Sequence, residues 1–322
     1  MNEVNILFSS VGRRVELVKE FKKALKELNM KGNLVGIDIS ENAPAMHFVD
    51  KKYLAPKILE EGFIDFVIEI CKKERINLII PIIDRELLLY SENKEYIKEK
   101  CGATVMISDI ETMEIVRNKI KTCEVLDEVG VKIPKVITKN DIDLNNLEFP
   151  LFIKPLDGSA SVKNFKVENK KELKFFGEYV PNPIIQEFIE GDEYCVDMLC
   201  DFNGEPIHIV PKLRIAHSSG EITTGKIVKD REIIDVGKLI AKTLKFSGEV
   251  NFDCIKNDKG IFVLEINGRF AGGAPMSISA GAKTPTNLIK LLLGENLEYK
   301  EDYDDGVIIS RFDDSIFINK NR

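Results

Sequence analysis

The sequence predicts an α/β protein whose first domain is a Rossmann-like, doubly wound parallel sheet and whose second domain is of the α+β class. Over residues 4–100, apolar segments alternate with amphipathic ones, which is typical of strands and helices in turn. From about residue 112 this alternation stops and hairpin-like pairs of strands follow. The 322 residues, 44% of them hydrophobic and 31% charged, suit two folded globular domains at roughly 150 residues each.

The first region contains three apolar segments that we expect to be strands, at 4–8, 34–37 and 78–83. Amphipathic segments at 15–28 and 64–74 predict the two helices between them. The order is therefore strand, helix, strand, helix, strand, as in a parallel sheet.

Ligands of such sheets bind beyond the carboxyl ends of the strands. Here those ends are followed by polar loops at 9–12, 38–40 and 83–86. The three loops predict the rim of a substrate pocket, with Gly12, Asp38 and Asp84 as candidate substrate residues.

The second region is expected to begin with a helix over 115–129 that ends at Gly130. We then expect, in chain order, strands at 151–153 and up to 167, a helix capped by Asn169, strands at 184–189, 193–199 and 207–210, a helix at 233–244, a hairpin over 249–266 and a helix at 287–293. The stretch 213–226 is polar and too long for a tight turn, so it predicts a mobile lid. The predicted domains are 1–111 and 112–300, the second with lobes of about 112–190 and 191–300, and a tail at 301–322.

Charge and cysteine usage exclude several classes of function. The net charge of −7 disfavours binding to a nucleic-acid backbone, and no local basic face stands out. Six scattered cysteines without a C-x-x-C pair indicate free thiols in a reducing cytoplasm. The start of the chain does not look like a leader, and the most apolar segment is far shorter than the roughly 20 residues that span a bilayer.

The strongest local signal for chemistry is the segment from Val263 to Arg269. The two-residue period of a strand places Glu265 and Asn267 on one face, beside Asp253 on the paired strand. Two carboxylates and an amide are oxygen ligands that suit Mg²⁺ together with substrate phosphates, and Arg269 favours a phosphate site. From the spacing alone, a solvated hairpin face with incidental acids is an equal alternative.

Two lysines lie where phosphates could be bound. Lys154 follows an apolar strand and precedes the small-residue turn 157–161, whose backbone N–H groups could bind an anion. Lys119 lies on the helix predicted at the start of the second region. Each lysine taken alone is also what an ordinary surface lysine looks like, so only their combination with other motifs carries meaning.

Two segments look like nucleotide-binding motifs, but their neighbouring residues do not fit those motifs. Residues 220–226 have the glycine and lysine spacing of a P-loop, but Ile227 replaces the hydroxyl residue and no apolar strand precedes them. A dinucleotide fingerprint needs three glycines after the first strand, and only one, Gly12, is present there. Asp38 does lie where a ribose-binding acid would be. The three histidines have no metal-ligand spacing, and His208 reads as a packed or surface ring.

Taken in order, the motifs resemble those of a known family. They are Asn118-Lys119, Ile153-Lys154-Pro155, the run from Gln186 to Glu193, Asp253, and the run from Glu265 to Arg269. This order resembles the ATP-grasp superfamily of ligases over about residues 1–300, including the Rossmann-like pre-ATP-grasp domain. The branch around the carbamoyl-phosphate synthase large subunit is similar, with its EINPR motif present here as EINGR.

The resemblance implies a set of ATP contacts. It implies that Lys119 and Lys154 bind the phosphates and that a flexible turn covers them. It also implies that a linker within the run from Gln186 to Glu193 holds the adenine of ATP. An acid at the end of that run would bind the ribose. The residues at these positions are Gly158, Ser159 and Ser161 in the turn, Glu187, Phe188 and Ile189 in the linker, and Glu193 as the acid.

The resemblance also implies metal-binding and catalytic residues. Asp253, Glu265 and Asn267 match the Mg²⁺ ligands, with Glu265 bridging two ions. Arg269 matches the arginine that steadies the transferred phosphoryl group, and Lys212 and Arg214 resemble a basic pair at the base of the lid. Substrate is then expected between the lid, Gly272 and Gly273, and the rim of the first domain.

The match has departures. Gly268 replaces the usual proline, and Asp253 stands where carbamoyl-phosphate synthases have glutamine. One half-length unit is not expected to make carbamoyl phosphate by the route of the two-unit enzyme. The likeness therefore concerns the fold and the ATP chemistry.

The implied activity is an ATP- and Mg²⁺-dependent carboxylate–amine ligase that works through an acyl phosphate and releases ADP and phosphate. Two Mg²⁺ ions are expected, with Mn²⁺ as an alternative, and the substrates would be a small carboxylate and an amine or related nucleophile. No nucleic-acid or membrane partner is expected, and a homodimer is left open. The alternatives are a catalytically silent nucleotide-binding regulatory protein and a Rossmann-type oxidoreductase.

Overall fold

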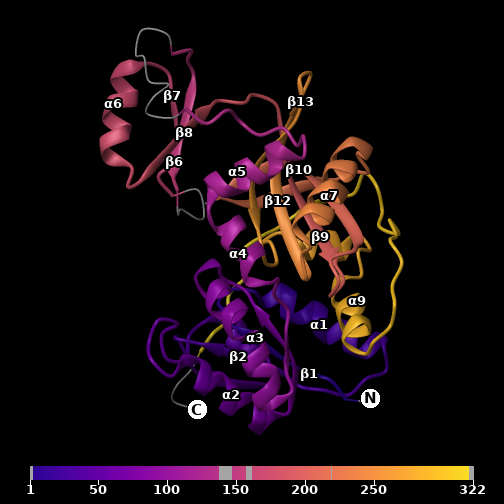
Figure 1. Cartoon of the computed structure of the whole chain (residues 1–322). Coiled ribbons are helices and arrows are strands. Elements are labelled where there is room, and N and C mark those ends of the chain that lie inside the picture. The colour runs from indigo at the N-terminus through magenta and orange to yellow at the C-terminus, as the bar shows by residue number, and fades with distance from the viewer. Residues whose placement is uncertain (1–2, 138–146, 157–161, 219, 319–322) are drawn as a thin grey trace.

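The structure is a computed structural model that describes residues 3–137, 147–156, 162–218 and 220–318. These residues form three sheets, and the Rossmann-like sheet, the large antiparallel sheet and a small separate lobe follow one another along the molecule (Figure 1). The predicted fold class, a parallel α/β domain followed by an α+β domain, is confirmed.

The first sheet is parallel throughout and has the strand order β3-β2-β1-β4-β5. Its strands are β1 (Asn5–Ser9), β2 (Leu34–Asp38), β3 (Lys51–Leu54), β4 (Ile76–Pro81) and β5 (Thr104–Val105), and its helices are α1 (Val15–Glu27), α2 (Phe63–Glu74) and α3 (Leu87–Cys101). Ile6 and Phe8 pack in one cluster with α1, whereas Leu7 packs in another with α2 and α3. Because both faces are covered, the central strands are apolar at almost every position.

The predicted helix over 115–129 is in fact two helices, α4 (Ile110–Arg117) and α5 (Lys119–Glu128). The break is at Asn118, whose side chain accepts hydrogen bonds from the N–H groups of Ile120 and Lys121 at 3.1 and 3.2 Å. A residue that caps a new helix cannot continue the previous one, because its own backbone is extended. The apolar periodicity continued across this break and concealed it.

A small lobe carries the expected antiparallel strands. It contains β6 (Leu151–Pro155), β7 (Phe165–Val167) and β8 (Pro183–Glu187) in the order β7-β6-β8, with α6 (Lys170–Tyr179) packed against them. The predicted cap Asn169 accepts hydrogen bonds from two N–H groups of the first turn of α6. Figure 1 shows this lobe standing apart from the two larger sheets.

The large sheet has the order β13-β12-β9-β10-β11-β14, and its pairs are antiparallel. Its strands are β9 (Asp192–Cys200), β10 (Pro206–Ser218), β11 (Glu221–Ile227), β12 (Gly248–Asn257), β13 (Gly260–Asn267) and β14 (Ile308–Ser310), and its helices are α7 (Arg231–Leu244), α8 (Ala274–Ser279) and α9 (Thr284–Leu292). Val196 and Phe252 pack beneath α7, which makes that face apolar. The opposite face carries Glu193 and Asp253, because side chains alternate along a strand.

The stretch 213–226 was predicted to be a mobile lid without strands of its own, and the structure shows that it is a strand pair. It forms the facing parts of β10 and β11, paired from Lys212–Ile227 to Ser218–Glu221. Ile222 and Ile227 are buried, while Thr223, Thr224 and Lys226 between them are half-buried. The alternation of a half-buried strand was hidden by the high average polarity of the segment.

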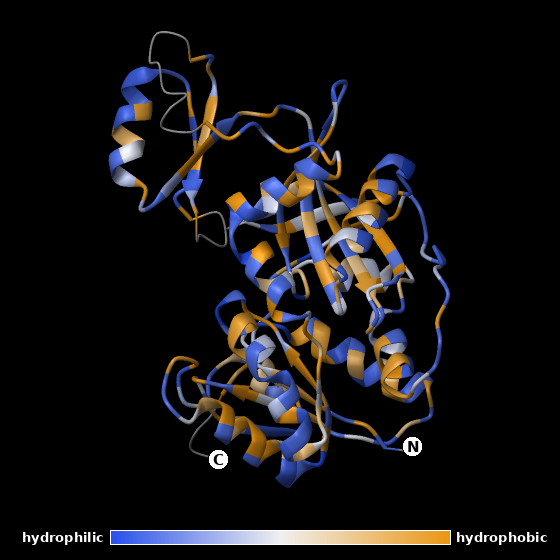
Figure 2. Ribbon diagram, in the orientation of Figure 1, coloured by the Kyte–Doolittle hydropathy of each residue, from blue (hydrophilic) through white to orange (hydrophobic). Residues whose placement is uncertain are grey.

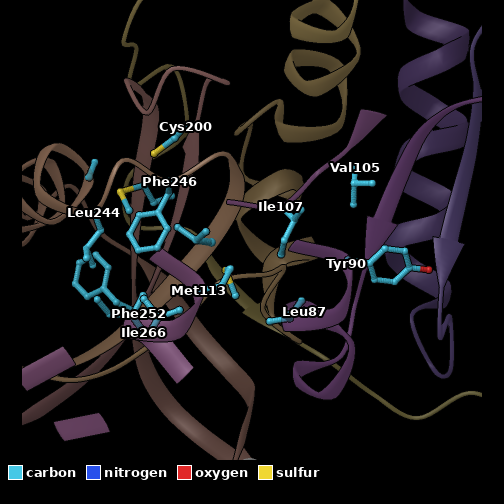
Figure 3. Close-up of a cluster of buried hydrophobic side chains, with 14 of the residues drawn as sticks. Leu87, Tyr90, Val105, Ile107, Met113, Cys200, Leu244, Phe246, Phe252 and Ile266 are labelled. Carbon is cyan, nitrogen blue, oxygen red and sulfur yellow. The ribbon is translucent and has the colours of Figure 1, made fainter. Parts of the chain in front are cut away.

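The main hydrophobic core joins the first domain to the large sheet. Figure 3 shows Leu87 and Tyr90 of the first domain in the same cluster as Phe252 and Ile266 of the large sheet, with Met113 of α4 between them. In Figure 2 hydrophobic residues follow the sheet strands, whereas the turn between β12 and β13 is hydrophilic. None of the described helices is both long and apolar enough to cross a bilayer.

His208 of β10 is a packed ring that faces Thr284 of α9, with 2.9 Å between Nε2 and Oγ1. Burial lowers the pKa of His208 to about 4. The pKa of a histidine in the unfolded chain is about 6.5. Between this value and the lower native pKa, the unfolded chain binds a proton that the native state does not bind. The stabilisation from the neutral ring is therefore complete above about pH 6.5 and is lost as the pH falls toward 4.

We predict that His208→Phe removes this part of the pH dependence. Between pH 7 and pH 4.5 the wild-type chain should lose about 2 kcal/mol more unfolding free energy than the variant. Urea denaturation at the two pH values measures this, with His47→Gln at an exposed position as the control. An equal loss in wild type and His208→Phe would contradict the assignment.

Candidate active site

The predicted metal ligands come together on the polar face of β12 and β13. Asp253 and Glu265 are directly opposite in the pairing register, and Asn267 is opposite Asn251. The Asn267 amide donates to Asn251 Oδ1 at 3.2 Å. The backbone carbonyl of Arg269 in turn accepts from the Asn251 amide at 2.8 Å, which holds the chain as it leaves β13.

Arg214 of β10 lies between two acids of this face. Its guanidinium donates to Glu193 at 2.8 Å and to Asp253 at 3.0 Å. Burial raises the pKa of Asp253 to about 6; Arg214 opposes the rise, and the negative charges of Glu265 and Glu193 add to it. The acids are thus close enough to repel one another, and an added cation would relieve that repulsion.

The two predicted phosphate lysines reach this face from the small lobe and α5. The Lys154 ammonium donates to the carbonyl of Leu264 at 3.2 Å, next to Glu265. The Lys119 ammonium donates to the carbonyl of Leu156 at 3.0 Å. Burial lowers the pKa of Lys154, the charge of Lys119 adds to this, and Glu265 opposes it. Polyphosphate placed here would offset the positive charges of the buried Lys154 and the half-buried Lys119.

The donor set fits Mg²⁺ only with help from a ligand. Among the described residues, no group of three or more His, Cys, Asp or Glu side chains comes together as a metal cage. Asp253, Glu265 and Asn267 supply two carboxylates and one amide. Mg²⁺ is commonly held by one or two carboxylates together with substrate phosphates and water, and this set matches that pattern.

The predicted adenine linker follows β8 and is tightly held. Glu187 accepts from the Lys135 N–H at 2.9 Å through its carboxylate, and its own N–H donates to the Lys135 carbonyl at 3.0 Å. Phe188 and Ile189 come next and are half-buried. The predicted phosphate-covering residues Gly158, Ser159 and Ser161 lie outside the described part of the chain.

A cavity of about 440 Å³ opens between the first domain and the large sheet. From the large sheet it is lined by Arg214, Asp253, Glu265, Asn267 and Arg269, among others, and from the first domain by Arg14 and residues 82–85. The predicted metal ligands and the predicted substrate residue Asp84 therefore line one cavity of a size that suits a small ligand.

Arg269 and Asp84 form the main contact across this cavity. The Arg269 guanidinium donates to both Asp84 oxygens, at 3.1 and 2.8 Å, and Arg117 lies 3.6 Å from the same carboxylate. Burial raises the pKa of Asp84, but Arg269 outweighs it and the net pKa is lowered. Asp84 is thus a charge-compensated partner of Arg269.

Some predicted residues lie elsewhere. Gly12 and Asp38 do not line this cavity, and the Asp38 carboxylate accepts from the N–H groups of Gly12 and Ser40, both at 2.9 Å. Lys212 does not line the cavity either: it is fully buried, pairs with Asp197 and donates to the carbonyl of Gly273 at 3.4 Å. Asp38 therefore joins the loop that follows β1 to the loop that follows β2. Lys212 contacts the cavity-lining segment through the Gly273 carbonyl.

Gly272 and Gly273 line the cavity, but their lack of a side chain serves the β10–β11 hairpin. A Cβ at Gly272 would lie 2.4 Å from the Glu221 carboxyl carbon, and one at Gly273 would lie 2.4 Å from Ile222 Cγ2. The glycines therefore let the start of β11 pack directly on the segment that follows β13.

Sequence reasoning missed Arg14, which lines the cavity, and placed Glu86 on a polar rim, whereas Glu86 is buried. Arg14 donates to Glu221 at 3.1 Å and so links the first domain to the hairpin. The fully buried Glu86 accepts from the N–H groups of Ile82 and Ile83, at 2.6 and 3.1 Å, and burial raises its pKa. Arg14 follows the first strand of the first sheet, which is a signal that could have found it.

Comparison with protein families identifies both parts of the chain. Residues 6–107 match the family described as PylC-like, N-terminal domain, and residues 116–273 match the family described as ATP-grasp domain. The carbamoyl-phosphate synthase of Methanobrevibacter smithii is 23% identical over 275 residues, which cover 80% of this chain and 73% of that protein. The 3-methyl-D-ornithine–L-lysine ligase of Methanosarcina mazei is 27% identical over 224 residues, which cover 68% of this chain and 55% of that protein.

The fold is shared with solved structures. The biotin carboxylase domain of the Hydrogenobacter thermophilus 2-oxoglutarate carboxylase, solved with MgADP and bicarbonate, aligns with a TM-score of 0.70 at 16% identity. The alignment covers 94% of this chain and 73% of that one. At this identity the likeness concerns the fold.

We predict that substitutions of Asp84 and Arg269 have strongly non-additive effects on the unfolding free energy. Asp84→Asn should lower the unfolding free energy by about 3 kcal/mol, because it leaves a buried guanidinium with a neutral partner. The double variant Asp84→Asn/Arg269→Gln should cost clearly less than the sum of the two single variants. Urea denaturation of the four proteins gives the coupling.

The matched control is the solvent-exposed pair formed by Lys238 and Asp235 at 3.4 Å. Asp235→Asn should change stability little, because exposed pairs contribute little. Additive costs at Asp84 and Arg269 would show that the pair does not hold the two domains together.

Proposed function

Because the chain belongs to the ATP-grasp superfamily of ATP-dependent ligases, we propose that it joins a small carboxylate to an amine or related nucleophile through an acyl phosphate. In this reaction a carboxylate oxygen of the acceptor attacks the γ-phosphorus of ATP, and the bond to the β-bridging oxygen breaks to release ADP. The nucleophile then attacks the acyl carbon, and phosphate leaves. Family membership and the carbamoyl-phosphate-synthase-like branch agree with the resemblance predicted from the sequence.

One observation supports this proposal more than any other. The Lys154 ammonium lies on the carbonyl next to Glu265, while Asp253 faces Glu265 across the strand pair. A lysine from one lobe and two carboxylates from the other thus meet at one place. Such a place suits a polyphosphate bound together with divalent cations.

The chain's own residues would act by position and charge. Lys119 and Lys154 would bind the ATP phosphates, and Glu193 with the linker 187–189 would hold the nucleoside. Asp253, Glu265 and Asn267 would hold Mg²⁺, two ions in our proposal with Mn²⁺ as a substitute. When bound, the metal neutralises charge on the transferred phosphoryl oxygens.

The cavity between the domains would hold the acceptor. Arg269 and Arg214 present positive charge to it, so we place the acceptor carboxylate on their side. Asp84 would act by holding Arg269 in place, and Gly272 and Gly273 by letting the hairpin close over the acyl phosphate and exclude water. An amino acid or sugar acid satisfies this arrangement, and such small-molecule substrates agree with the relative named 3-methyl-D-ornithine–L-lysine ligase.

The two alternatives are separable. For an oxidoreductase, Asp38 would have to bind a ribose, but its oxygens already accept the N–H groups of Gly12 and Ser40. A silent nucleotide-binding protein would bind ATP and release no ADP with any acceptor. The acids and lysines expected for phosphoryl transfer are all present in the chain, which favours the ligase.

A screen of ADP release tests the proposal. The chain, MgATP and an amine mixture are incubated with amino acids, dipeptides and sugar acids, each with and without hydroxylamine. An accepted carboxylate should raise ADP release and give a hydroxamate, because hydroxylamine traps an acyl phosphate. ATP binding without acceptor-dependent ADP release would support the silent protein instead.

We predict that Glu265→Gln lowers kcat for acceptor-dependent ADP release by about 10²-fold or more, because the metal loses a charged ligand. Glu298→Gln, at an exposed position, is the control and should retain the wild-type rate. Steady-state ADP release measures both. Wild-type turnover in Glu265→Gln would remove this residue from the metal site.

A further inference from the structure

Two arginines of the first domain line the cavity, and the mechanism proposed above gives them no role. Arg14 comes directly before α1, and Arg85 lies in a short 3₁₀ helix (Asp84–Glu86) that follows β4. Strands β1 and β4 are neighbours in the parallel sheet, so the segments that follow them lie side by side at its carboxyl edge. Arg14 and Arg85 are therefore on the wall of the cavity that the first domain provides.

Most of the hydrogen-bonding capacity of these two side chains is unused. A guanidinium group carries five N–H donors. Among the described residues, the Arg14 side chain makes one hydrogen bond, from Nη1 to Glu221 at 3.1 Å. Arg85 has no hydrogen-bond or ion-pair partner in the described part of the chain. The Arg14 side chain is 20% exposed and Arg85 is an exposed residue, so a ligand in the cavity can reach the unused donors.

The acids at this end of the cavity are already bound by arginines, so they do not oppose an anion as free carboxylates would. Glu221 accepts from both Arg14 and Arg311, at 3.1 and 3.2 Å. Asp84 accepts the two hydrogen bonds from Arg269. Burial lowers the pKa of Arg14; Glu221 opposes this, and the positive charge of Arg269 adds to it. A bound anion would offset this positive charge.

We propose that Arg14 and Arg85 bind a second anionic group of the acceptor, which is then a dicarboxylic acid or a phosphorylated carboxylic acid. This inference rests on the proposed ligase function and narrows the acceptor of that reaction. The carboxylate that attacks ATP has to lie at the other wall, which the large sheet provides with Asp253 and Glu265. A group bound by the first-domain wall is therefore a different group of the same molecule.

The chemistry and the size of the cavity both suit such an acceptor. A planar guanidinium group can donate two parallel hydrogen bonds to a carboxylate or a phosphate. The volume of about 440 Å³ is large enough for a small molecule that carries two anionic groups. An acceptor with an ammonium group or an amide in place of the second anion would leave Arg14 and Arg85 without a charged partner, which disfavours its binding.

The screen of ADP release tests this inference when it is run on the full chain with matched pairs of acids. Each pair differs in the second group: glutamate and glutamine, succinate and succinamate, 3-phosphoglycerate and glycerate. The first two pairs probe a carboxylate and the third probes a phosphate. In the pair that the chain accepts, the acid with two anionic groups should have a kcat/KM at least about 10-fold higher, because hydrogen bonds between charged groups contribute that much to binding.

Variants of the two arginines test the location of the second group. Arg85→Gln and Arg14→Gln should each raise KM for the accepted acid about 10-fold or more and leave kcat and the KM of ATP unchanged, because the bound group does not react. Arg14→Lys should recover part of the loss, since it restores the charge. Arg85 has no partner in the described chain, so its substitution should not disturb folding. The matched control is Arg13→Gln, which should keep the wild-type constants: Arg13 is exposed, lies 3.6 Å from Asp313 and does not line the cavity.

Thermal unfolding gives a second readout that does not need turnover. With Mg²⁺ and AMP-PNP in the nucleotide site, one of the acids with two anionic groups should raise Tm more than its partner does in the wild type, but not in Arg85→Gln. Equal kcat/KM within every pair, or wild-type KM in both glutamine variants, would overturn the inference and leave the ligase function standing. Selective stabilisation that depends on Arg85 but comes without ADP release would support the anion site and contradict the ligase function. Neither ADP release nor selective stabilisation with any pair would overturn both.

Discussion

The ion pair between Arg269 and Asp84 is the contact on which the arrangement of this molecule most depends. Asp84 follows β4 of the first sheet, and Arg269 comes two residues after the end of β13, so the pair joins the exits of two strands from different domains. The Arg269 guanidinium makes two hydrogen bonds to Asp84, at 3.1 and 2.8 Å, and both side chains are mostly buried. A two-pronged contact of this kind fixes orientation as well as distance.

The same contact decides what the cavity between the domains can recognise. Arg269 and Arg214 bring positive charge to the cavity, and each is already held by a carboxylate, Asp84 in one case and Asp253 in the other. The guanidinium groups are thus fixed before any ligand arrives, which lowers the entropy lost on binding an anion. In our proposal Lys154, Asp253 and Glu265 hold the nucleotide phosphates and metal, so the phosphoryl donor and the acceptor would meet at one edge of the large sheet.

Local sequence patterns were enough for the parts of the fold that depend on local rules. The period of two along β13 correctly placed Glu265 and Asn267 on one face, with Asp253 opposite. The same rule failed for the β10–β11 hairpin, because the polar residues between Ile222 and Ile227 hid the fact that both are buried. Tertiary contacts lay beyond prediction. Asp84 was predicted as a substrate residue, because nothing local to it reveals that Arg269, 185 positions away in the chain, lies against it in space.

The most direct measurement of the central claim is a crystal structure of the chain with Mg²⁺ and the non-hydrolysable analogue AMP-PNP. The β- and γ-phosphates should lie between the ammonium of Lys154 and the carboxylate of Glu265, with metal density between phosphate oxygens and Asp253, Glu265 and Asn267. The adenine should lie against the linker that follows β8. A nucleotide seated instead at the loops that follow β1 and β2 of the first sheet would contradict this account.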